Sequence, residues 1–316
     1  MQQRKHRPSW PGQPSHSWPL LLTLILLSFT ACRRTTQMTP ARTPAAAPTS
    51  TTAPTTSPAS TLYAGFRYST YGPPYNPGPQ YWVNVGRRMA DKFPSASPQA
   101  IWIVGSLAGQ GTRLSFPGSS TDPYIQFAAS DENEETLTLF DQAGLTVWLQ
   151  VEPGEASMEE LIQLILVQYG HHPCVIGFGL DVEWYHSYEE PIGQAVTDAE
   201  AAAWVTAIRS HGPQYHLFLK HWLVEMMPPT ERDGLFFIDD SQQFESLDQM
   251  TAEFVQWGQA FAPAPVGFQY GYPDDRKWWG QLADPASEIG QRLMDIPNLQ
   301  GLYWVDFTVL DVFPPH

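Results

Sequence analysis

Cysteine and basic residues are both scarce in this chain. Its 316 residues include two cysteines, Cys32 and Cys174, which argues against a disulfide-stapled scaffold and against a cysteine metal site. Lys and Arg total 17 against 32 Asp and Glu, a formal net charge of −15. Residues 61–316 hold all 32 acidic residues and 11 of the basic ones, so their formal charge is 11 minus 32, or −21. This excess excludes a nucleic-acid partner, which needs a basic surface, and favours neutral ligands over anionic polysaccharides or acidic lipids.

A long hydrophobic run is also missing. The apolar stretch 20–29 is too short to span a bilayer, and it follows Arg4, Lys5 and Arg7, as in a secretory signal. The small residues before Cys32 resemble the lipobox of bacterial lipoproteins, in which that cysteine is lipidated. We therefore expect residues 1–32 to be a signal peptide with lipidation at Cys32, and an extracytoplasmic, membrane-anchored protein. The alternative is ordinary signal cleavage nearby, which leaves a soluble secreted protein.

Residues 33–60 are almost entirely Thr, Pro, Ala and Ser and include no acidic residue. A segment of this composition has too few apolar side chains to form a core, so we expect a disordered tether. Residues 61–316 have a suitable length for one folded domain. We expect that domain to be a monomer, attached to the membrane through the lipid anchor only.

The domain alternates short apolar runs with amphipathic stretches. Eight runs rich in aromatic and branched residues are predicted as strands: 62–68, 100–107, 145–152, 175–183, 216–222, 234–240, 265–270 and 299–307. Helices are expected after the capping residues Ser157, Thr197 and Ser246, over 80–93 and 132–144, and over part of 276–294. The link 226–232 looks short and irregular.

Eight strands with helical crossovers predict an α/β fold of the (β/α)8 type, a TIM barrel, in which the last helix is missing or replaced. A doubly wound open sheet is the alternative. No Gly-x-Gly-x-x-Gly turn follows the first strand to support it. The chain shows no internal repeat and no second folded domain.

The predicted strand 175–183 ends in two acids, Asp181 and Glu183. Alternate residues of a strand point to the same face, so both carboxyl groups should lie together. Burying an acid pair is costly, but glycoside hydrolysis needs a protonated carboxyl group beside a second carboxyl. Glu183, flanked by Trp184 and Tyr185, is the better proton donor, with Asp181 as its partner. The bland alternative is a structural pair neutralised by Arg67 or Lys220.

In TIM barrels the active site lies at the carboxyl ends of the strands. The residues expected there are mainly acids, amides and aromatics: Tyr68, Ser106, Gln150, Glu152, Asp181, Glu183, Lys220, Trp222, Asp239, Asp240, Gln269, Tyr270, Trp304 and Asp306. Outside the catalytic pair, we expect six residues to contact substrate: Glu152, Asp239, Tyr270, Trp304, Trp184 and Lys220. Asp239 and Asp240 are adjacent, so at most one of them points inward.

The opposite, amino ends of the strands carry a different set. His171, His172 and Cys174 precede the fourth strand, on the face that serves stability in such barrels. This placement disfavours a zinc site at the histidine pair, and Cys174 is expected to be a small core residue. No metal and no organic cofactor is implied.

The segment Gly179-Leu-Asp-Val-Glu183 resembles the end of the Asp-x-x-Asp-x-Asp-x-Glu strand of family 18 glycoside hydrolases, the chitinase type. Glu183 matches the catalytic acid of that motif and Asp181 the aspartate beside it, whereas the two earlier aspartates fall on Gly179 and Ile176. Trp304 stands where that family has its pocket-floor tryptophan. The resemblance implies retaining hydrolysis in which an N-acetyl group of the substrate attacks, oriented by Asp181. Family 25 muramidases also end a strand in Asp-x-Glu, but their early catalytic aspartate has no counterpart in residues 66–69.

Two other functions are open to this sequence. A degenerate barrel that lacks the earlier aspartates could bind a glycan without cutting it. Lys220, a lysine among acids, could form a Schiff base with a carbonyl substrate, although such a lysine more often pairs with a carboxylate. The sequence favours the first function, an extracytoplasmic glycoside hydrolase acting on a neutral or N-acetylated glycan.

Overall fold

The computed structural model describes residues 61–188 and 190–315. The predicted signal peptide, Cys32 and the tether lie outside the described residues. Within the described part, no helix is long and apolar enough to cross a membrane.

Eight parallel strands close into a barrel, which confirms the predicted fold. In chain order the barrel strands are β1 (Tyr63–Tyr68), β2 (Ser97–Ala108), β5 (Thr146–Val151), β6 (Val175–Asp181), β7 (His216–Lys220), β8 (Leu235–Asp239), β9 (Val266–Tyr270) and β10 (Leu299–Val305). Each pairs with its neighbour in the chain, and β1 pairs with both β2 and β10 to complete the ring. All eight lie within the predicted runs to within a few residues.

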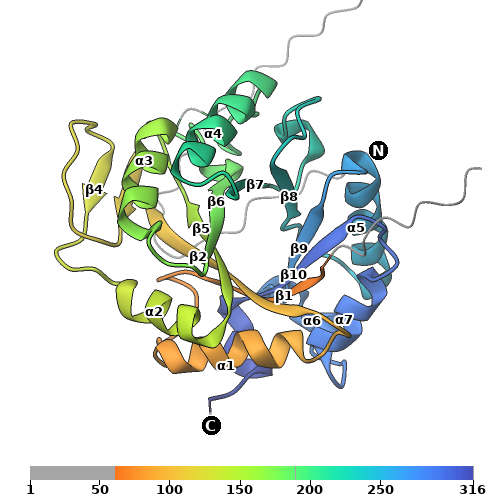
Figure 1. The fold of residues 1–316 in the computed structure, drawn as a ribbon. Coiled ribbons are helices and arrows are strands. Elements are labelled where there is room, and N and C mark those ends of the chain that lie inside the picture. The colour runs from red at the N-terminus through yellow and green to blue at the C-terminus, as the bar shows by residue number, and fades with distance from the viewer. Residues whose placement is uncertain (1–60, 189, 316) are drawn as a thin grey trace, which may run out of the picture. The chain divides into compact units, whose positions relative to one another are not determined.

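Helices surround the strands (Figure 1). They are α1 (Pro79–Ala90), α2 (Glu134–Ala143), α3 (Met158–Tyr169), α4 (Asp198–His211), α5 (Leu247–Phe261), α6 (Arg276–Trp279), α7 (Pro285–Leu293) and α8 (Val309–Val312). The predicted caps are present: the side chains of Ser157, Thr197 and Ser246 accept from the backbone N–H groups three residues on. Between β7 and β8 lies only the 3-10 turn η2 (Val224–Met226), and the four-residue α8 replaces a full last helix.

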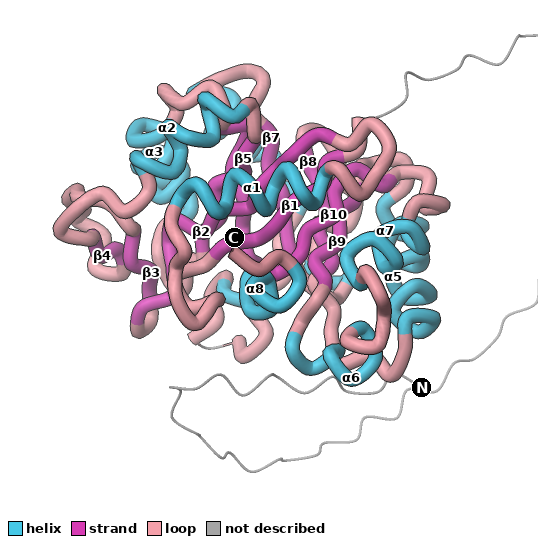
Figure 2. Tube along the Cα trace, turned by 90° about the horizontal axis from the view of Figure 1, so that it is seen from below, coloured by secondary structure: helices cyan, strands magenta, loops and turns pink. Residues whose placement is uncertain are grey.

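One excursion from the barrel was not predicted. After β2 the chain forms β3 (Gly111–Leu114), antiparallel to β2, and then β4 (Ile125–Phe127), parallel to β3. Both Figure 1 and Figure 2 show β4 outside the ring of barrel strands. Strands of four and three residues among Gly, Pro and Ser give too short an alternating pattern to be detected.

The lower part of the barrel interior is packed with aromatic side chains. A separate buried cluster joins Trp148, Phe218, Phe236 and Tyr303 to two isoleucines of β2 and β8. The space for these rings comes from glycines on neighbouring strands. A Cβ atom on Gly179, for example, would lie 2.1 Å from the Phe218 ring. Large and small residues therefore complement each other across the barrel axis.

Polar groups at the bottom of the barrel are satisfied. The Gln99 side-chain oxygen accepts hydrogen bonds from Trp148 Nε1 at 2.9 Å and from the Tyr303 hydroxyl. Its amide nitrogen donates to Thr146 at 3.0 Å. This half of the interior is close-packed and electrically neutral.

Candidate active site at the carboxyl ends of the strands

Charged side chains replace aromatic ones at the upper end of the barrel. Five carboxyl groups lie buried where the strands end, each from a residue no more than 7 % exposed: Glu152, Asp181, Glu183, Asp240 and Asp306. Two buried cations, Arg67 at the end of β1 and Lys220 at the end of β7, lie among them. Burial raises the pKa of three of these groups, Asp181, Glu152 and Asp306, so this part of the cluster retains protons to a higher pH than free carboxyl groups do.

Lys220 bridges two of the acids. Its Nζ lies 2.8 Å from Asp181 Oδ2 and also contacts Asp240 Oδ2. Burial alone would lower the pKa of Lys220, but attraction to these two carboxylates outweighs burial and raises it. A Schiff base needs a neutral amine, so this geometry favours the ion-pair interpretation of Lys220 over the aldolase-like one.

Asp181 remains protonated to an unusually high pH. Burial raises its pKa to about 7, and the neighbouring Asp240 and Glu152 add to this, although Lys220 pulls the other way. Gln150 Nε2 lies 3.4 Å from Asp181 Oδ2. Its other oxygen, Oδ1, is buried with no hydrogen-bond partner among the described residues. Asp181 is therefore a carboxyl group whose Oδ2 is held by Lys220 and whose buried Oδ1 has no hydrogen-bond partner among the described residues.

Glu183 reaches the cluster in a different way from the one predicted. Strand β6 ends at Asp181, and Val182–Trp184 form a 3-10 turn, η1, so the strand periodicity does not extend to Glu183. Glu183 is nevertheless buried, and Trp184 beside it is half-buried. The expectation that the two acids share the face of one strand was wrong, because the chain turns immediately after Asp181.

Glu152 is held from two sides. The Tyr71 hydroxyl donates to Glu152 Oε1, and the backbone N–H of Leu107 donates to Oε2 at 2.9 Å. Burial raises the pKa of Glu152 despite these bonds, which favour its charged form. Tyr71 was not predicted as a site residue, because it lies in a Gly- and Pro-rich loop after β1 that has no periodic pattern.

Arg67 and Asp306 close the other side of the cluster. The Arg67 guanidinium lies 2.8 Å from Asp306 Oδ1 and 4.5 Å from the centre of the Phe307 ring. The Ser69 hydroxyl donates to Asp306 Oδ2 at 2.7 Å. Arg67 thus forms an ion pair with Asp306, and Lys220 forms ion pairs with Asp181 and Asp240.

Three predicted contact residues lie elsewhere. Asp240, not Asp239, contacts Lys220; Asp239 accepts from the backbone of Ser241 at 2.7 Å, and the Ser241 hydroxyl bonds Glu253 of α5. Tyr270 points outward and donates to the Ala286 carbonyl of α7 at 3.2 Å.

Trp304 is also directed away from the barrel axis. It is fully buried, donates to Thr308 Oγ1 at 2.9 Å and packs edge-on against Tyr270 and Trp279. The prediction that Tyr270 and Trp304 contact sugar is therefore corrected: both belong to the core between strands and helices. On β9 and β10, the residues that face inward are their neighbours, such as Tyr303.

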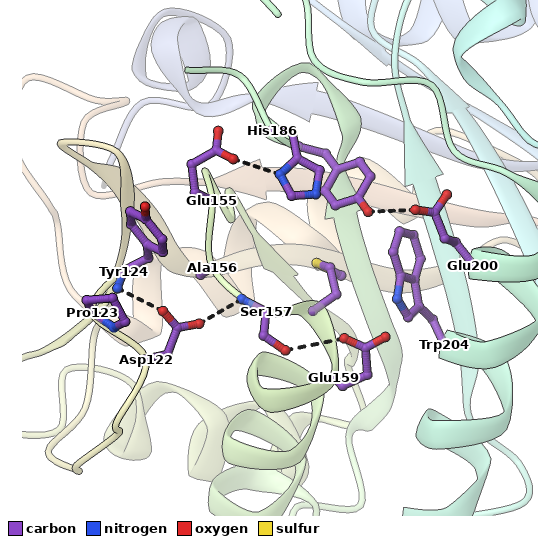
Figure 3. Close-up of a pocket in the computed structure, with 12 residues that line it drawn as sticks. Asp122, Pro123, Tyr124, Glu155, Ala156, Ser157, Glu159, His186, Glu200 and Trp204 are labelled. Atoms are coloured by element: carbon purple, nitrogen blue, oxygen red, sulfur yellow. Dashed lines mark hydrogen bonds and ion pairs between the residues drawn. The ribbon is translucent and has the colours of Figure 1, made fainter. Parts of the chain in front are cut away.

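A pocket lies among the segments that follow β5 and β6, and its lining includes none of the clustered acids (Figure 3). This rim pocket has a volume of about 410 Å³ and is lined mainly by Asp122, Tyr124, Glu155, Ser157, Tyr185, His186, Glu200 and Trp204. His186 Nδ1 lies 2.7 Å from Glu155 Oε2, and the Tyr185 hydroxyl donates to Glu200 at 2.9 Å. Its walls continue the two loops that carry Glu152 and Glu183, and these loops are joined by a bridge between Gly154 and Tyr185.

Comparison with known proteins adds a distant structural likeness. No family model matches the chain, and no curated protein matches it, so the resemblance to family 18 stays a prediction. An FMN-binding beta-glucuronidase from Facaelibacterium prausnitzii is similar over 78 % of this chain and 37 % of its own, with 11 % identity and a TM-score of 0.48. A Parabacteroides merdae beta-glucuronidase is similar over 77 % of this chain and 31 % of its own, with 11 % identity and a TM-score of 0.46. A Pseudomonas stutzeri endoglucanase is similar over 77 % of this chain and 85 % of its own, with 15 % identity and a TM-score of 0.44.

All three TM-scores are below 0.5, so the likeness is weak. The chain spans only about a third of the length of either glucuronidase. At these identities and TM-scores the likeness carries no conclusion about a fold, a substrate or particular residues.

Proposed function

We propose that the barrel domain hydrolyses glycosidic bonds in a neutral or N-acetylated glycan. The observation that supports this most directly is the surplus of buried carboxyl groups over cations at the carboxyl ends of the strands. A glycosidase needs one carboxyl group that is protonated near neutral pH and another that stabilises developing positive charge on the sugar. A cluster that must retain protons supplies both forms.

In this proposal Glu183 is the general acid. It gives its proton to the glycosidic oxygen as the bond from that oxygen to the anomeric carbon breaks. On an N-acetylated sugar, the acetamido oxygen attacks the anomeric carbon, and Asp181, anchored by Lys220 at 2.8 Å, orients that group. Water then replaces the acetamido oxygen and returns a proton to Glu183. Glu152, held by Tyr71 and Leu107, supplies a further carboxylate to the positively charged sugar.

The rest of the glycan would lie in the rim pocket. Four acidic side chains of this pocket, Asp122, Glu155, Glu159 and Glu200, offer acceptors for sugar hydroxyls. Asp181 Oδ1 and Asp240 Oδ1 add two buried acceptors that have no hydrogen-bond partner in the part of the chain that the structure describes.

Glycan binding without hydrolysis is the second candidate. It is favoured by the space around Gly179, where the family 18 motif has an aspartate. The Phe218 ring occupies that space, so an acidic side chain cannot be accommodated there. An incomplete acid motif is what a barrel that only binds would retain.

The test is release of reducing ends from a glycan panel that includes chitin oligomers and peptidoglycan. We expect Glu183→Gln to reduce turnover by about a hundredfold or more, the usual contribution of an acid–base group. Glu135→Gln, on the exposed face of α2, is the matched control and should keep full activity. Equal turnover in Glu183→Gln would contradict the assignment. If no protein turns over, binding of the same oligomers measured by calorimetry would support the second candidate.

Attachment to a membrane is a separate proposal that rests on the sequence alone. We propose that Cys32 is lipidated and that residues 33–60 tether the barrel outside the cytoplasm. The full chain should then partition into the membrane fraction, and Cys32→Ala should release it. A wild-type chain found only in the soluble fraction would contradict lipidation.

A further inference from the structure

A second cluster of titratable side chains lies at the opposite end of the barrel. Glu134 and Asp141 come from α2, and His171, His172 and Cys174 come from the link between α3 and β6. Because this link precedes β6, the cluster lies at the amino end of the strands, away from the proposed active site. Its members are brought together by the fold from segments that are 30 or more residues apart.

The hydrogen bonds of the two imidazole rings define where their protons lie. His171 Nδ1 is 3.0 Å from the carbonyl oxygen of Gln168, which can only accept. His172 Nδ1 is 2.6 Å from Asp141 Oδ2. The other oxygen of this carboxyl group, Asp141 Oδ1, accepts from the backbone N–H of Cys174 at 2.8 Å, so the group is placed as an acceptor on both sides. Each ring therefore carries a proton on Nδ1, and in the neutral ring Nε2 presents a lone pair.

Both lone pairs are directed at the same carboxylate. His172 Nε2 lies 3.3 Å from Glu134 Oε2, and His171 Nε2 lies 3.6 Å from Glu134 Oε1. Three electron-pair donors that converge in this way repel one another unless a cation lies between them. In a tetrahedral site with metal–ligand bonds of about 2.0–2.1 Å, neighbouring ligand atoms are separated by about 3.3 Å. The two histidine–carboxylate separations of 3.3 and 3.6 Å are similar to this value, and one ligand atom from each of the three residues lies within 4.8 Å of the others.

We propose that Glu134, His171 and His172 bind a divalent zinc-type ion. Two imidazoles and one carboxylate form a ligand set that zinc accepts, with water in the fourth position. Asp141 is a positioning residue: its bond to Nδ1 holds the His172 ring in place, as outer carboxylates do around metal-bound histidines. Mg²⁺ and Ca²⁺ prefer oxygen ligands and should not bind here.

Cys174 is not a ligand in this proposal. It is buried, and its Sγ is directed at the Leu137 carbonyl oxygen, 3.6 Å away. The ligand atoms that gather around Glu134 come from Glu134, His171 and His172, without Cys174. The ion would instead join α2 to the link before β6, at the end of the barrel that supports stability. The sequence had disfavoured zinc because of this position, and a structural ion is compatible with it.

The test uses the full-length protein freed of metal with EDTA and then dialysed. Titration with ZnCl₂ should show one site by calorimetry and raise the melting temperature, whereas MgCl₂ should do neither. His171→Ala and Glu134→Gln should abolish the zinc-dependent shift. Both side chains are half exposed, 59 % and 49 %, so the variants should fold. Asp141→Asn should weaken zinc binding by about 10–100-fold.

His216→Ala and Glu135→Gln are the matched controls, since both residues are exposed and belong to neither cluster. They should retain wild-type zinc binding. A wild-type protein that shows no zinc-dependent shift would overturn the proposal. Zinc binding that is unchanged in His171→Ala and Glu134→Gln would also overturn it, because the ion would then bind elsewhere. Neither result depends on glycan turnover.

Discussion

The two halves of the barrel interior differ in composition: the lower half is filled by aromatic side chains and the upper half by charged ones. In the lower half, aromatic rings fill the spaces left by glycines, and the few polar groups bond one another around Gln99. In the upper half, five acids compete for two cations, and buried oxygens of Asp181 and Asp240 have no partner among the described residues. The lower half is complete without a ligand. The upper half is not, which is typical of a site whose polar groups are matched to something that binds.

The largest effect on this contrast should come from removing the shared cation. Lys220→Met keeps the unbranched apolar part of the side chain but removes Nζ, which leaves Asp181 and Asp240 without a counterion. We expect the free energy of unfolding at pH 8 to fall by about 3–5 kcal/mol, as when one partner of a buried ion pair is removed. Urea denaturation would measure it.

Lys277→Met is the control for that substitution. Its ion pair with Glu245 lies on the surface, with side chains 49 % and 79 % exposed, so its loss should cost less than about 1 kcal/mol. Equal costs for the two variants would mean that the Lys220 ion pairs contribute no more than a surface contact.

A smaller effect is expected in the neutral half. Gly179→Ala introduces a methyl group 2.1 Å from the Phe218 ring, and such overpacking should cost about 1–3 kcal/mol. Combining it with Phe218→Leu should recover part of this loss, because the two positions share one space. Gly105→Ala, where a Cβ would approach only side-chain atoms at 3.0 Å or more, should cost less. Strictly additive losses would show that Gly179 and Phe218 are not coupled.

The smallest effect concerns pH. The pKa of Asp181 is raised from 3.8 to about 7 in the folded protein, so the folded state holds an extra proton between these values. The stabilisation is complete below about pH 4 and is lost as the pH rises through 7. The melting temperature in EDTA should therefore fall by a few degrees between pH 5 and 8. Asp181→Asn, neutral at every pH, should flatten this slope.

Asp248→Asn, at an exposed carboxylate, should leave the slope unchanged. An identical slope in wild type and Asp181→Asn would show that Asp181 does not retain its proton.

The fold could be predicted because each barrel strand is a dense apolar run bounded by turn residues. The predicted strands also placed most residues of the candidate site. Glu152, Asp181, Glu183 and Lys220 lie at or near the ends of predicted strands, and all four are buried there. The β3–β4 excursion was missed, since its strands are too short for a pattern.

The direction of individual side chains was harder to predict. Both faces of a TIM-barrel strand are buried, so an apolar run does not reveal which residues face the axis. A shift of one residue reverses every assignment, which is why Asp239, Tyr270 and Trp304 were misplaced. The turn at Val182–Trp184 was likewise hidden, because the apolar and aromatic residues there also suit a strand.

The β3–β4 excursion has a consequence for how this protein can change over generations. Asp122, which it contributes to the rim pocket, is tied to the rest of the domain by a bond to the backbone of Ser157 at 2.9 Å. The excursion adds nothing to the ring of eight strands or to the aromatic packing inside it. Leu114, Phe116 and Ile125 anchor the excursion in the main core and must be kept, but substitutions at its exposed positions can remodel the pocket wall while the barrel keeps its sequence. Descendants of this chain can thus change the pocket through those exposed positions at little risk to folding.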